Sequence, residues 1–482
     1  MVHLQPVLIP SVRSLWLQEA LAAEPDAERV EPLIGAHVTD VCIVGGGYTG
    51  LWTALRIRDL DPSIRVTIVE ADICGAGASG RNGGMALPWW TKAKRLFRVC
   101  GEDEGRFLLN ESVKAIDEIE KFCATNGVDA KIRRDGQLQL ATTPLHLDSW
   151  RENLDLVDSL GMGDPIETVS AADAARRGGS TTYVGGIFER QGATVQPALL
   201  ARGLRRVALE RGVTIHEKTP VLRIGDGNPL RLQTPSGEVV ADKVVLATNA
   251  WSTAIPELRR HMIVVSSDMV ATAPIPQRLE AIGWTGGESI SDCRLMVHFL
   301  HVTHDARIVI GRGSGALAYL GRLTPVFDES LERARTVVDG LHRLYPRLAD
   351  VPITHRWAGP IDRSRSGTLI FGRLKLNPNI HYGIGYSGTG VAQTVMGGKI
   401  LASSVLELVD EWSTSRLNQG PVVLYPPDPV RFFGGLAVRA VLARTEQQEE
   451  NDVVPSTWAK RFGKIAYPYV PRRADRLIWA AT

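Results

Sequence analysis

The sequence lacks an excess of charge of either sign. Its 482 residues contain 55 lysines and arginines against 53 aspartates and glutamates, which leaves a formal net charge of +2. A chain with this balance has no strong electrostatic field with which to bind nucleic acid or an anionic membrane surface. We therefore expect a small-molecule partner and no nucleic acid.

Cysteine is scarce and its spacing is irregular. None of the five cysteines belongs to a C-x-x-C pair; they are Cys42, Cys74, Cys100, Cys123 and Cys293. This pattern argues against a disulfide framework and against a zinc site. We expect a reducing compartment and predict no metal.

Long apolar segments are missing as well. The longest apolar runs are well short of the roughly 20 residues that a membrane-spanning helix needs. The first residues also lack the basic region and the continuous apolar region of a secretory signal. The sequence therefore predicts a cytoplasmic protein without a membrane span.

The sequence does contain a clear βαβ pattern. Residues 39–44 form an apolar run of strand length, residues 51–60 read as a helix, and residues 66–70 read as a second strand. The chain is long for one compact domain, so we expect two domains.

Between the first strand and the helix lies a glycine-rich turn. Gly45, Gly47 and Gly50 match the G-x-G-x-x-G pattern of dinucleotide-binding folds in its required context. The first glycine permits the tight turn, the second lets the backbone approach a pyrophosphate, and the third lets helix and strand pack closely. Glu70 ends the second strand, where a carboxylate accepts hydrogen bonds from ribose hydroxyls. These features predict a dinucleotide whose adenosine carries no 2′-phosphate.

Three further segments favour FAD over NAD. Residues 75–84 are a run of small residues suited to a backbone that lies along a flavin, although a flexible loop is the alternative. Residues 247–251 follow a buried strand, where the chain of nucleotide-binding folds turns across the adenosine half of the cofactor. Residues 383–391 form a second glycine-rich turn that opens a helix, and its free amides suit the flavin C2 carbonyl.

Together these segments resemble the D-amino-acid-oxidase superfamily of FAD enzymes, and more narrowly its γ-glutamylputrescine oxidase-like branch. The most specific blocks are residues 39–51, 77–84, 371–374 and 385–391. With the glycine motif and Glu70, the resemblance implies a set of FAD-binding residues: Gly45, Gly47, Tyr48, Thr49, Gly50, Glu70, Ala78, Ser79, Arg81, Asn82, Gly83, Gly84, Val221, Thr248, Asn249, Trp251, Gly385, Tyr386, Gly388, Thr389, Gly390 and Val391.

The resemblance also implies the fold and the chemistry. We expect an α/β two-domain protein of the D-amino-acid-oxidase or glutathione-reductase type, with a Rossmann-like FAD-binding domain around a parallel sheet and an antiparallel β-sheet substrate domain. The predicted ranges are 37–95, 165–255 and 352–420 for the FAD-binding domain, 96–164 and 256–351 for the substrate domain, 1–36 for an N-terminal lead-in, and 421–482 for a C-terminal extension. In similar enzymes a hydride leaves the carbon beside an amine nitrogen for flavin N5, the imine hydrolyses, and O2 commonly reoxidises the flavin to give hydrogen peroxide.

The sequence departs from the superfamily where substrate specificity is set. Members that act on amino acids carry an arginine for the substrate carboxylate where this chain has Ile361, although Arg363 or Arg356 offers a substitute from a shifted backbone. A simple α-amino acid is therefore disfavoured. The cysteine that binds FAD covalently in sarcosine-oxidase relatives is absent from residues 354–380, and Ala392 replaces their lysine, so we predict non-covalent FAD.

The oxygen-reactive lysine of those relatives is also missing from residues 307–311, so the sequence leaves O2 and another electron acceptor both open. It identifies no catalytic residue. It suggests a set of substrate-lining candidates: His298, His301, Trp89, Asp362 and Arg363. For the two histidines a structural role is at least as good an explanation. For Trp89 the alternative is packing between the domains. The Asp362 carboxylate could pair with a substrate ammonium or, within the protein, with Arg363.

We therefore predict oxidation of a C–N bond in a small amine. One alternative is a flavoenzyme that oxidises a natural-product scaffold at a carbon not next to nitrogen. Another is a non-catalytic flavin-binding subunit of a larger complex. A homo-oligomer is left open.

Overall fold

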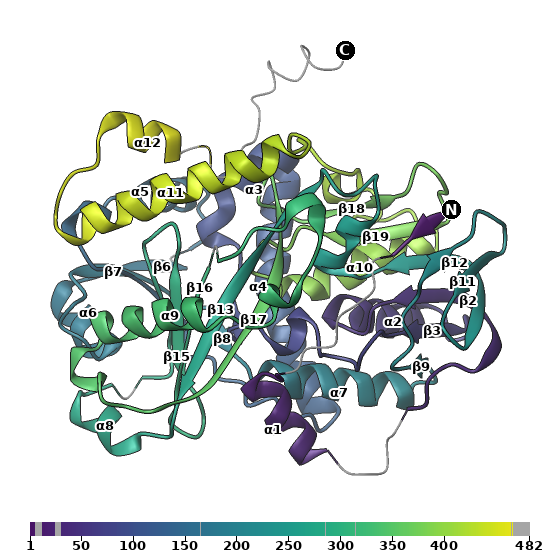
Figure 1. Cartoon of the computed structure of the whole chain (residues 1–482), viewed down its shortest axis with the longest axis horizontal. Coiled ribbons are helices and arrows are strands. Elements are labelled where there is room, and N and C mark those ends of the chain that lie inside the picture. The colour runs from purple at the N-terminus through teal and green to yellow at the C-terminus, as the bar shows by residue number, and fades with distance from the viewer. Residues whose placement is uncertain are drawn as a thin grey trace.

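The computed structural model describes residues 1–4, 12–24, 30–163, 165–284, 286–313, 315–463 and 465. Within these residues the chain forms two large β-sheets, one in each half of the molecule, with helices packed around them (Figure 1). The mixed α/β architecture agrees with the predicted fold class.

The first sheet has a parallel centre. Its described strands are β1 (Val2–His3), β2 (Gly35–Val44), β3 (Val66–Val69), β9 (Thr214–His216), β10 (Arg223–Ile224), β11 (Leu230–Gln233), β12 (Gly237–Leu246), β18 (Ile370–Arg373) and β19 (Ile380–Ile384). Strands β19, β12, β2, β3 and β9 run parallel to their neighbours in that order. The buried, apolar ends of β2 and β3 suit a sheet that is covered on both faces.

Helices complete this half of the molecule. Helix α2 (Tyr48–Leu60) connects β2 to β3, which confirms the predicted βαβ unit. It packs against α10 (Gln393–Val405) and α7 (Pro197–Glu210). Leu51, Leu204 and Ile400 are fully buried in the core that these helices share.

The second sheet is mostly antiparallel. Its described strands, in spatial order, are β17 (Ile353–Ser364), β13 (Met262–Thr272), β16 (Ile308–Arg312), β15 (His298–Val302), β14 (Ser289–Asp292), β5 (Gln137–Ala141), β7 (Gly185–Glu189) and β6 (Ile166–Val169). Helix α9 (Leu331–Leu344) packs against β13 and β16. Strands β4 (Met85–Ala86) and β8 (Ala193–Thr194) form a small separate pair. Further described helices are α3 (Ala93–Cys100), α4 (Glu102–Thr125), α5 (Arg151–Ser159), α6 (Ala171–Gly178) and α8 (Pro276–Ala281).

The sheets do not follow the predicted domain ranges at every element. Strands β6, β7 and β17 lie in ranges predicted for the FAD-binding domain, but they pair in the second sheet. Helix α4 lies in a range predicted for the substrate domain, but it packs against α10. Its apolar face joins the core of α2 and α10 through side chains such as Leu108 and Ile119. The sequence spacing of these elements carries no signal of which sheet they join.

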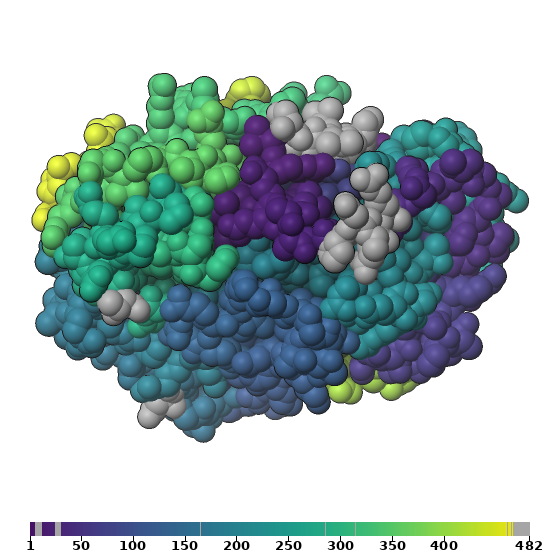
Figure 2. Space-filling model, turned by 90° about the horizontal axis from the view of Figure 1, so that it is seen from below, coloured from purple at the N-terminus to yellow at the C-terminus, as the bar shows by residue number. Residues whose placement is uncertain are grey.

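The predicted N-terminal lead-in contains ordered structure. Helix α1 (Leu15–Ala23) buries Trp16, which is 1% exposed, and packs against α7. The Trp16 indole Nε1 donates a hydrogen bond to the carbonyl of Asn82 at 2.9 Å. Figure 2 shows the N-terminal residues, in purple, set into this face between the green and the blue parts of the chain. Helix α1 is therefore part of the folded core.

The described part of the C-terminal extension forms a helical strap over the second sheet. Helix α11 (Val430–Glu450) crosses that half of the molecule and is followed by α12 (Thr457–Gly463) (Figure 1). The Glu446 carboxylate accepts hydrogen bonds from the Met296 amide at 2.7 Å and from Arg312 at 3.0 Å. The strap thus fixes the segment that leads into β15.

Candidate active site

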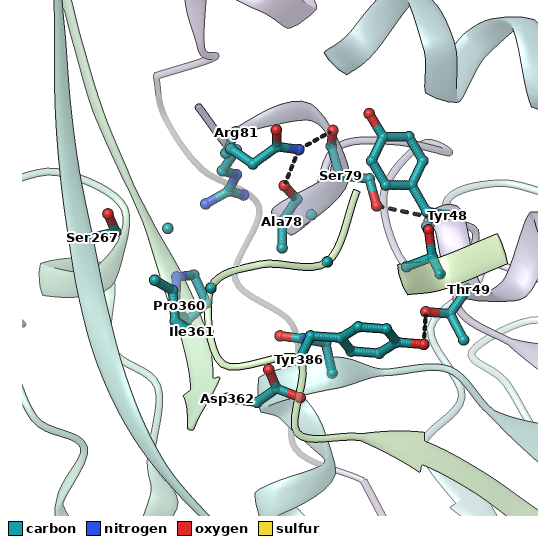
Figure 3. Close-up of a pocket in the computed structure, with 18 of the residues that line it drawn as sticks. Tyr48, Thr49, Ala78, Ser79, Arg81, Ser267, Pro360, Ile361, Asp362 and Tyr386 are labelled. Atoms are coloured by element: carbon teal, nitrogen blue, oxygen red, sulfur yellow. Dashed lines mark hydrogen bonds between the residues drawn. The ribbon is translucent and has the colours of Figure 1, made fainter. Parts of the chain in front are cut away.

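A cavity of about 540 Å³ lies between the two sheets. At one end it is lined by residues that follow β2 and β3, and at the other end by residues of β13, β15 and β17. Part of its wall is shown in Figure 3, where Tyr48, Thr49 and Ser79 stand opposite Pro360 and Ile361. The volume lies in the range of cofactor and small-molecule sites.

The first glycine turn has no room for side chains. Gly45 has φ +111°, and a Cβ there would lie 2.6 Å from the Ala247 carbonyl oxygen. A Cβ on Gly50 would lie 2.0 Å from the carbonyl oxygen of Gly45. Gly47 lines the cavity and caps the N-terminus of α2. The turn can therefore bring backbone amides and the positive end of the helix dipole to a pyrophosphate, as its spacing predicts.

Glu70 lies at the cavity end next to β3. Its carboxylate accepts hydrogen bonds from the amides of Gly46 at 2.7 Å and Asp72 at 2.9 Å. Burial raises the pKa of Glu70 to about 7, although these two hydrogen bonds oppose the shift. A carboxylate has further lone pairs, so ribose hydroxyls remain compatible partners. The same end is lined by the predicted residues Val221, Thr248, Asn249 and Trp251.

The loop at 77–84 is held in shape by its own side chains. The Asn82 amide donates to the carbonyls of Ala78 at 3.2 Å and Ser79 at 2.9 Å, and its Oδ1 accepts from the Gly84 amide at 2.8 Å. The Ser79 hydroxyl accepts from the Tyr48 amide at 2.8 Å (Figure 3). These bonds make the loop an ordered wall of the cavity, so the flexible-loop alternative is not favoured.

Arg81 ties the same loop to the second sheet. Its guanidinium pairs with Asp328 at 2.6 Å and donates from Nε to the Ala76 carbonyl at 2.8 Å. The Ala358 amide of β17 donates to the Asp328 carbonyl at 2.8 Å, so the ion pair joins the loop to the second sheet through Asp328.

The second glycine turn, at 385–390, is fixed by Asp362. The buried Asp362 carboxylate accepts a hydrogen bond from the Gly385 amide, and the Ser387 amide donates to the Asp362 carbonyl at 3.1 Å. Burial raises the pKa of Asp362 to about 6. Thr49 donates to the Tyr386 hydroxyl at 2.8 Å, which joins the two glycine turns (Figure 3). Asp362 lines the cavity, and its carboxylate accepts a hydrogen bond from a backbone amide of the turn.

Most of the predicted cofactor residues line this one cavity. Gly50, Gly84 and Gly385 are outside its lining and shape the turns instead. The residues brought together at the cavity wall are Gly45, Gly47, Tyr48, Thr49, Glu70, Ala78, Ser79, Arg81, Asn82, Gly83, Val221, Thr248, Asn249, Trp251, Tyr386, Gly388, Thr389, Gly390 and Val391.

The two candidate histidines lie outside the cavity lining. His298 is buried and its Nδ1 bonds the Asp292 carboxylate at 2.8 Å. His301 stacks on Trp16 with ring centroids 5.9 Å apart, and burial lowers its pKa to about 4. Phe299, between them on β15, is the residue of this strand that lines the cavity. The structure thus favours the structural alternative for both histidines.

Trp89 is likewise outside the lining. Its indole is buried in the core that contains α2, α4 and α10, and its amide donates to the Ser112 hydroxyl at 3.0 Å. This placement favours the packing alternative. Arg363 does line the cavity, whereas Arg356 pairs with Glu329 at 2.8 Å and lies outside it.

Several residues on the substrate side of the cavity could not be identified from the sequence. Besides Phe299, these are Thr91, Lys92, Gln137, Gln139, Met269 and Ser291. These six residues belong to four separate stretches of the sequence, and none carries a motif. The pairing of β5 with β14 places Gln137 and Gln139 beside Ser291, and Met269 lies on β13 of the same sheet. Thr91 and Lys92 come from the 3-10 helix Trp90–Lys92, outside that sheet.

Comparison with known proteins identifies the family. The family model DAO, described as FAD dependent oxidoreductase, matches residues 40–404. The chain belongs to the DAO family of FAD-dependent oxidoreductases. This confirms the predicted FAD cofactor and the resemblance drawn from the glycine-rich segments.

Individual relatives are similar to this chain over most of its length. The chain is 29% identical over 366 residues to gamma-glutamylputrescine oxidoreductase of Escherichia coli (strain K12), covering 75% of this chain and 82% of the relative. It is 28% identical over 385 residues to the probable oxidoreductase OrdL of Haemophilus influenzae, covering 78% and 84%. It is 23% identical over 390 residues to glycine oxidase of Bacillus subtilis, covering 77% of this chain and 95% of the relative.

Solved structures of DAO-family enzymes share the fold. The crystal structure of L-proline dehydrogenase from P. horikoshii matches with a TM-score of 0.64 at 18% identity, covering 79% of this chain and 98% of that chain. Glycine oxidase from Geobacillus kaustophilus matches with a TM-score of 0.63 at 19% identity and the same coverage. The predicted fold class is confirmed.

No helix within the described residues is long and apolar enough to cross a membrane.

Proposed function

We propose that this enzyme oxidises a C–N bond of a small amine that is not a simple α-amino acid. One observation carries the proposal: the cavity that joins the two glycine turns continues onto the second sheet, and Ile361 lies there at the position where amino-acid-oxidising relatives are expected to carry arginine. Ile361 packs close to the second glycine turn, with its Cδ1 3.6 Å from where a Cβ on Gly388 would stand. An apolar side chain cannot bind a carboxylate there. The names of relatives support the reaction class, since they include gamma-glutamylputrescine oxidoreductase and glycine oxidase.

The cavity wall suits an FAD molecule from end to end. Glu70 and Asn249 lie where we place the adenosine, and the turn at 45–50 is where we place the pyrophosphate. The loop at 77–84 and the turn at 385–390 would hold the flavin ring. When bound, FAD would supply the acceptor for the hydride of the substrate carbon. We expect FAD to be held without a covalent bond.

The substrate side of the cavity favours a neutral amine. Among the described lining residues the carboxylates are Glu70, Asp72 and Asp362, and the first two lie at the adenosine end while Asp362 holds the Gly385 amide. Gln137, Gln139 and Ser291 on the substrate side offer neutral hydrogen-bonding groups. Hydride loss from carbon requires the nitrogen lone pair, so a site without an anionic partner favours the reactive form of the amine. Apolar neighbours such as Met269 and Phe299 exclude water from the same region.

Anaerobic reduction of the bound flavin tests the proposal. A panel of primary and secondary amines and of α-amino acids is mixed with the holoenzyme without oxygen, and loss of the yellow colour is followed. We expect amines to bleach the flavin and simple α-amino acids to leave it oxidised. Bleaching by α-amino acids alone would contradict the proposal. Readmission of air then separates O2 from other acceptors, because only an oxidase recovers its colour quickly.

A further inference from the structure

Two residues at the start of α1 contact the loop at 77–84 on the side that faces away from the cavity. The Ser14 hydroxyl donates a hydrogen bond to the Gly80 carbonyl at 2.6 Å. The Trp16 indole Nε1 donates to the Asn82 carbonyl at 2.9 Å. Ser14 and Trp16 are buried and lie outside the cavity lining, whereas the loop lines it. The loop therefore lies between these two side chains and the cavity.

The carbonyl between these two is bound in the same way. Trp357 of β17 donates from its Nε1 to the Arg81 carbonyl at 2.9 Å, and Trp357 is also buried outside the lining. In a trans peptide the carbonyl and the amide that follows it point in opposite directions. Because the carbonyls of Arg81 and Asn82 are directed away from the cavity, the amides of Asn82 and Gly83 are turned toward it. Neither amide donates to an acceptor within the described residues.

Ion pairs fasten both ends of α1 to the same part of the chain. Before the helix, the Arg13 guanidinium pairs with the Asp72 carboxylate, with one hydrogen bond of 2.8 Å. After the helix, Glu24 pairs with Arg202 of α7 at 2.6 Å, and Arg202 also donates to the Cys74 carbonyl at 3.2 Å. Asp72 and Cys74 lie just before the loop. The segment is thus connected to the chain that enters the loop as well as to the loop itself.

We infer that residues 13–24 form a latch that holds the loop at 77–84 in the shape that binds FAD, with Trp16 as its main positioning residue. Trp16 fixes the peptide that carries the Gly83 amide. Its ring also packs edge-on against Trp357, with ring centroids 6.2 Å apart, and Trp357 fixes the preceding peptide. The latch would therefore keep two amide donors directed at the flavin.

This inference goes beyond the family likeness, because the latch lies before residues 40–404, the range that the family model matches. It rests on the placement of FAD proposed above and does not depend on the substrate. A coupling between two binding events is reciprocal. If the docked latch strengthens FAD binding, FAD must stabilise the docked latch by the same factor.

Removal of single donors tests the latch. Trp16→Phe keeps an aromatic ring against His301 but leaves the Asn82 carbonyl without its donor. Ser14→Ala does the same to the Gly80 carbonyl. We expect each variant to raise the Kd for FAD by roughly 5- to 150-fold, the range for leaving a buried polar group unsatisfied. The Kd is measured from the fluorescence of the FAD that is released when holoenzyme is diluted.

Two matched substitutions control for a general loss of stability. Trp284→Phe changes another buried tryptophan, which stacks on Tyr345 and whose Nε1 has no hydrogen-bond partner in the described part of the chain. Ser170→Ala removes the N-cap side chain of α6, as Ser14→Ala removes that of α1. Both controls should keep the Kd for FAD within about twofold of wild type. The latch is refuted if Trp16→Phe and Ser14→Ala bind FAD as tightly as these controls.

Hydrogen exchange in the wild type supplies a readout that needs no substitution. The holoenzyme is compared with the same chain after removal of FAD. Loss of FAD should speed amide exchange in α1 by a larger factor than in α6, which reports the change in overall stability. Equal acceleration in the two helices would overturn the inference.

The latch and the proposed reaction fail in different ways. If simple α-amino acids alone bleach the flavin, the proposed substrate class is wrong, and the FAD affinities still decide the latch. If amines bleach the flavin but Trp16→Phe retains the wild-type FAD affinity, the latch is refuted and the proposed reaction stands.

Discussion

Replacement of Gly50 by alanine tests whether the first glycine turn is built around close contact of helix and strand. Gly50 lies in the first turn of α2. In most helices a change from glycine to alanine stabilises by up to about 1 kcal/mol, because alanine loses less backbone entropy. Here the new Cβ would lie 2.0 Å from the Gly45 carbonyl oxygen and 3.2 Å from the Ile43 side chain.

The steric overlap should outweigh the helix preference. Ordinary van der Waals contact begins at 3.4 Å, and the closer atom belongs to backbone that no rotamer change can move. The start of α2 must therefore shift by roughly 1 Å or more, and overpacking of this kind costs about 1–3 kcal/mol. The same shift would move the amides of the turn away from where we place the pyrophosphate. Loss of one hydrogen bond to a charged group should weaken FAD binding by about 10- to 100-fold.

The assay compares Gly50→Ala with Gly434→Ala. Gly434 lies exposed in α11, and a Cβ there meets nothing within 4 Å. We expect Gly434→Ala to keep the wild-type FAD affinity and an equal or slightly higher Tm, whereas Gly50→Ala lowers both. FAD affinity is measured by quenching of FAD fluorescence on titration with apoprotein. Equal behaviour of the two variants would refute the argument from close packing.

Three further predictions follow from the site and its supports. Precipitation with acid should release all yellow colour into the supernatant, and colour retained in the protein pellet would show a covalent bond to FAD. Because burial raises the pKa of Asp362 to about 6, ionisation in the fold is unfavourable, so the Tm of wild-type apoprotein should fall relative to Asp362→Asn as pH rises from about 4 to 6; parallel pH profiles would contradict this. Glu446→Ala leaves the Met296 amide and Arg312 without their acceptor, so the free energy of unfolding should fall by about 1–3 kcal/mol. The KM for substrate should rise as well, because the neighbouring residues Leu295 and Val297 line the cavity. The exposed control Gln447→Ala should change neither quantity.

Local features of the sequence were enough to predict the cofactor half of the site. The glycine turn at 45–50 depends on a strand, a turn and a helix that follow one another, so its spacing can be read directly. The same holds for the second turn before α10. In both cases the absence of side chains is itself the signal, because glycine is required where the backbone approaches another backbone or a ligand.

The substrate half depends on contacts between distant segments. On β15 we predicted His298 and His301 as lining residues, but Phe299 is the residue of this strand that lines the cavity. His298 points to the other face of the sheet, because side chains alternate along a strand. His301 is covered by Trp16 from a segment predicted to be a lead-in. Lys92 reaches Thr389 across almost 300 residues of sequence, and no local pattern encodes that contact.

The central claim is that the enzyme oxidises a carbon next to nitrogen. Single-turnover analysis tests it most directly: the holoenzyme is reduced without oxygen by one amine that bleaches its flavin, and the products are counted against the flavin reduced. The account predicts one aldehyde or ketone and one molecule of ammonia or released amine for each flavin. A product that retains all its nitrogen and is stable to hydrolysis, with only two hydrogens lost, would contradict it.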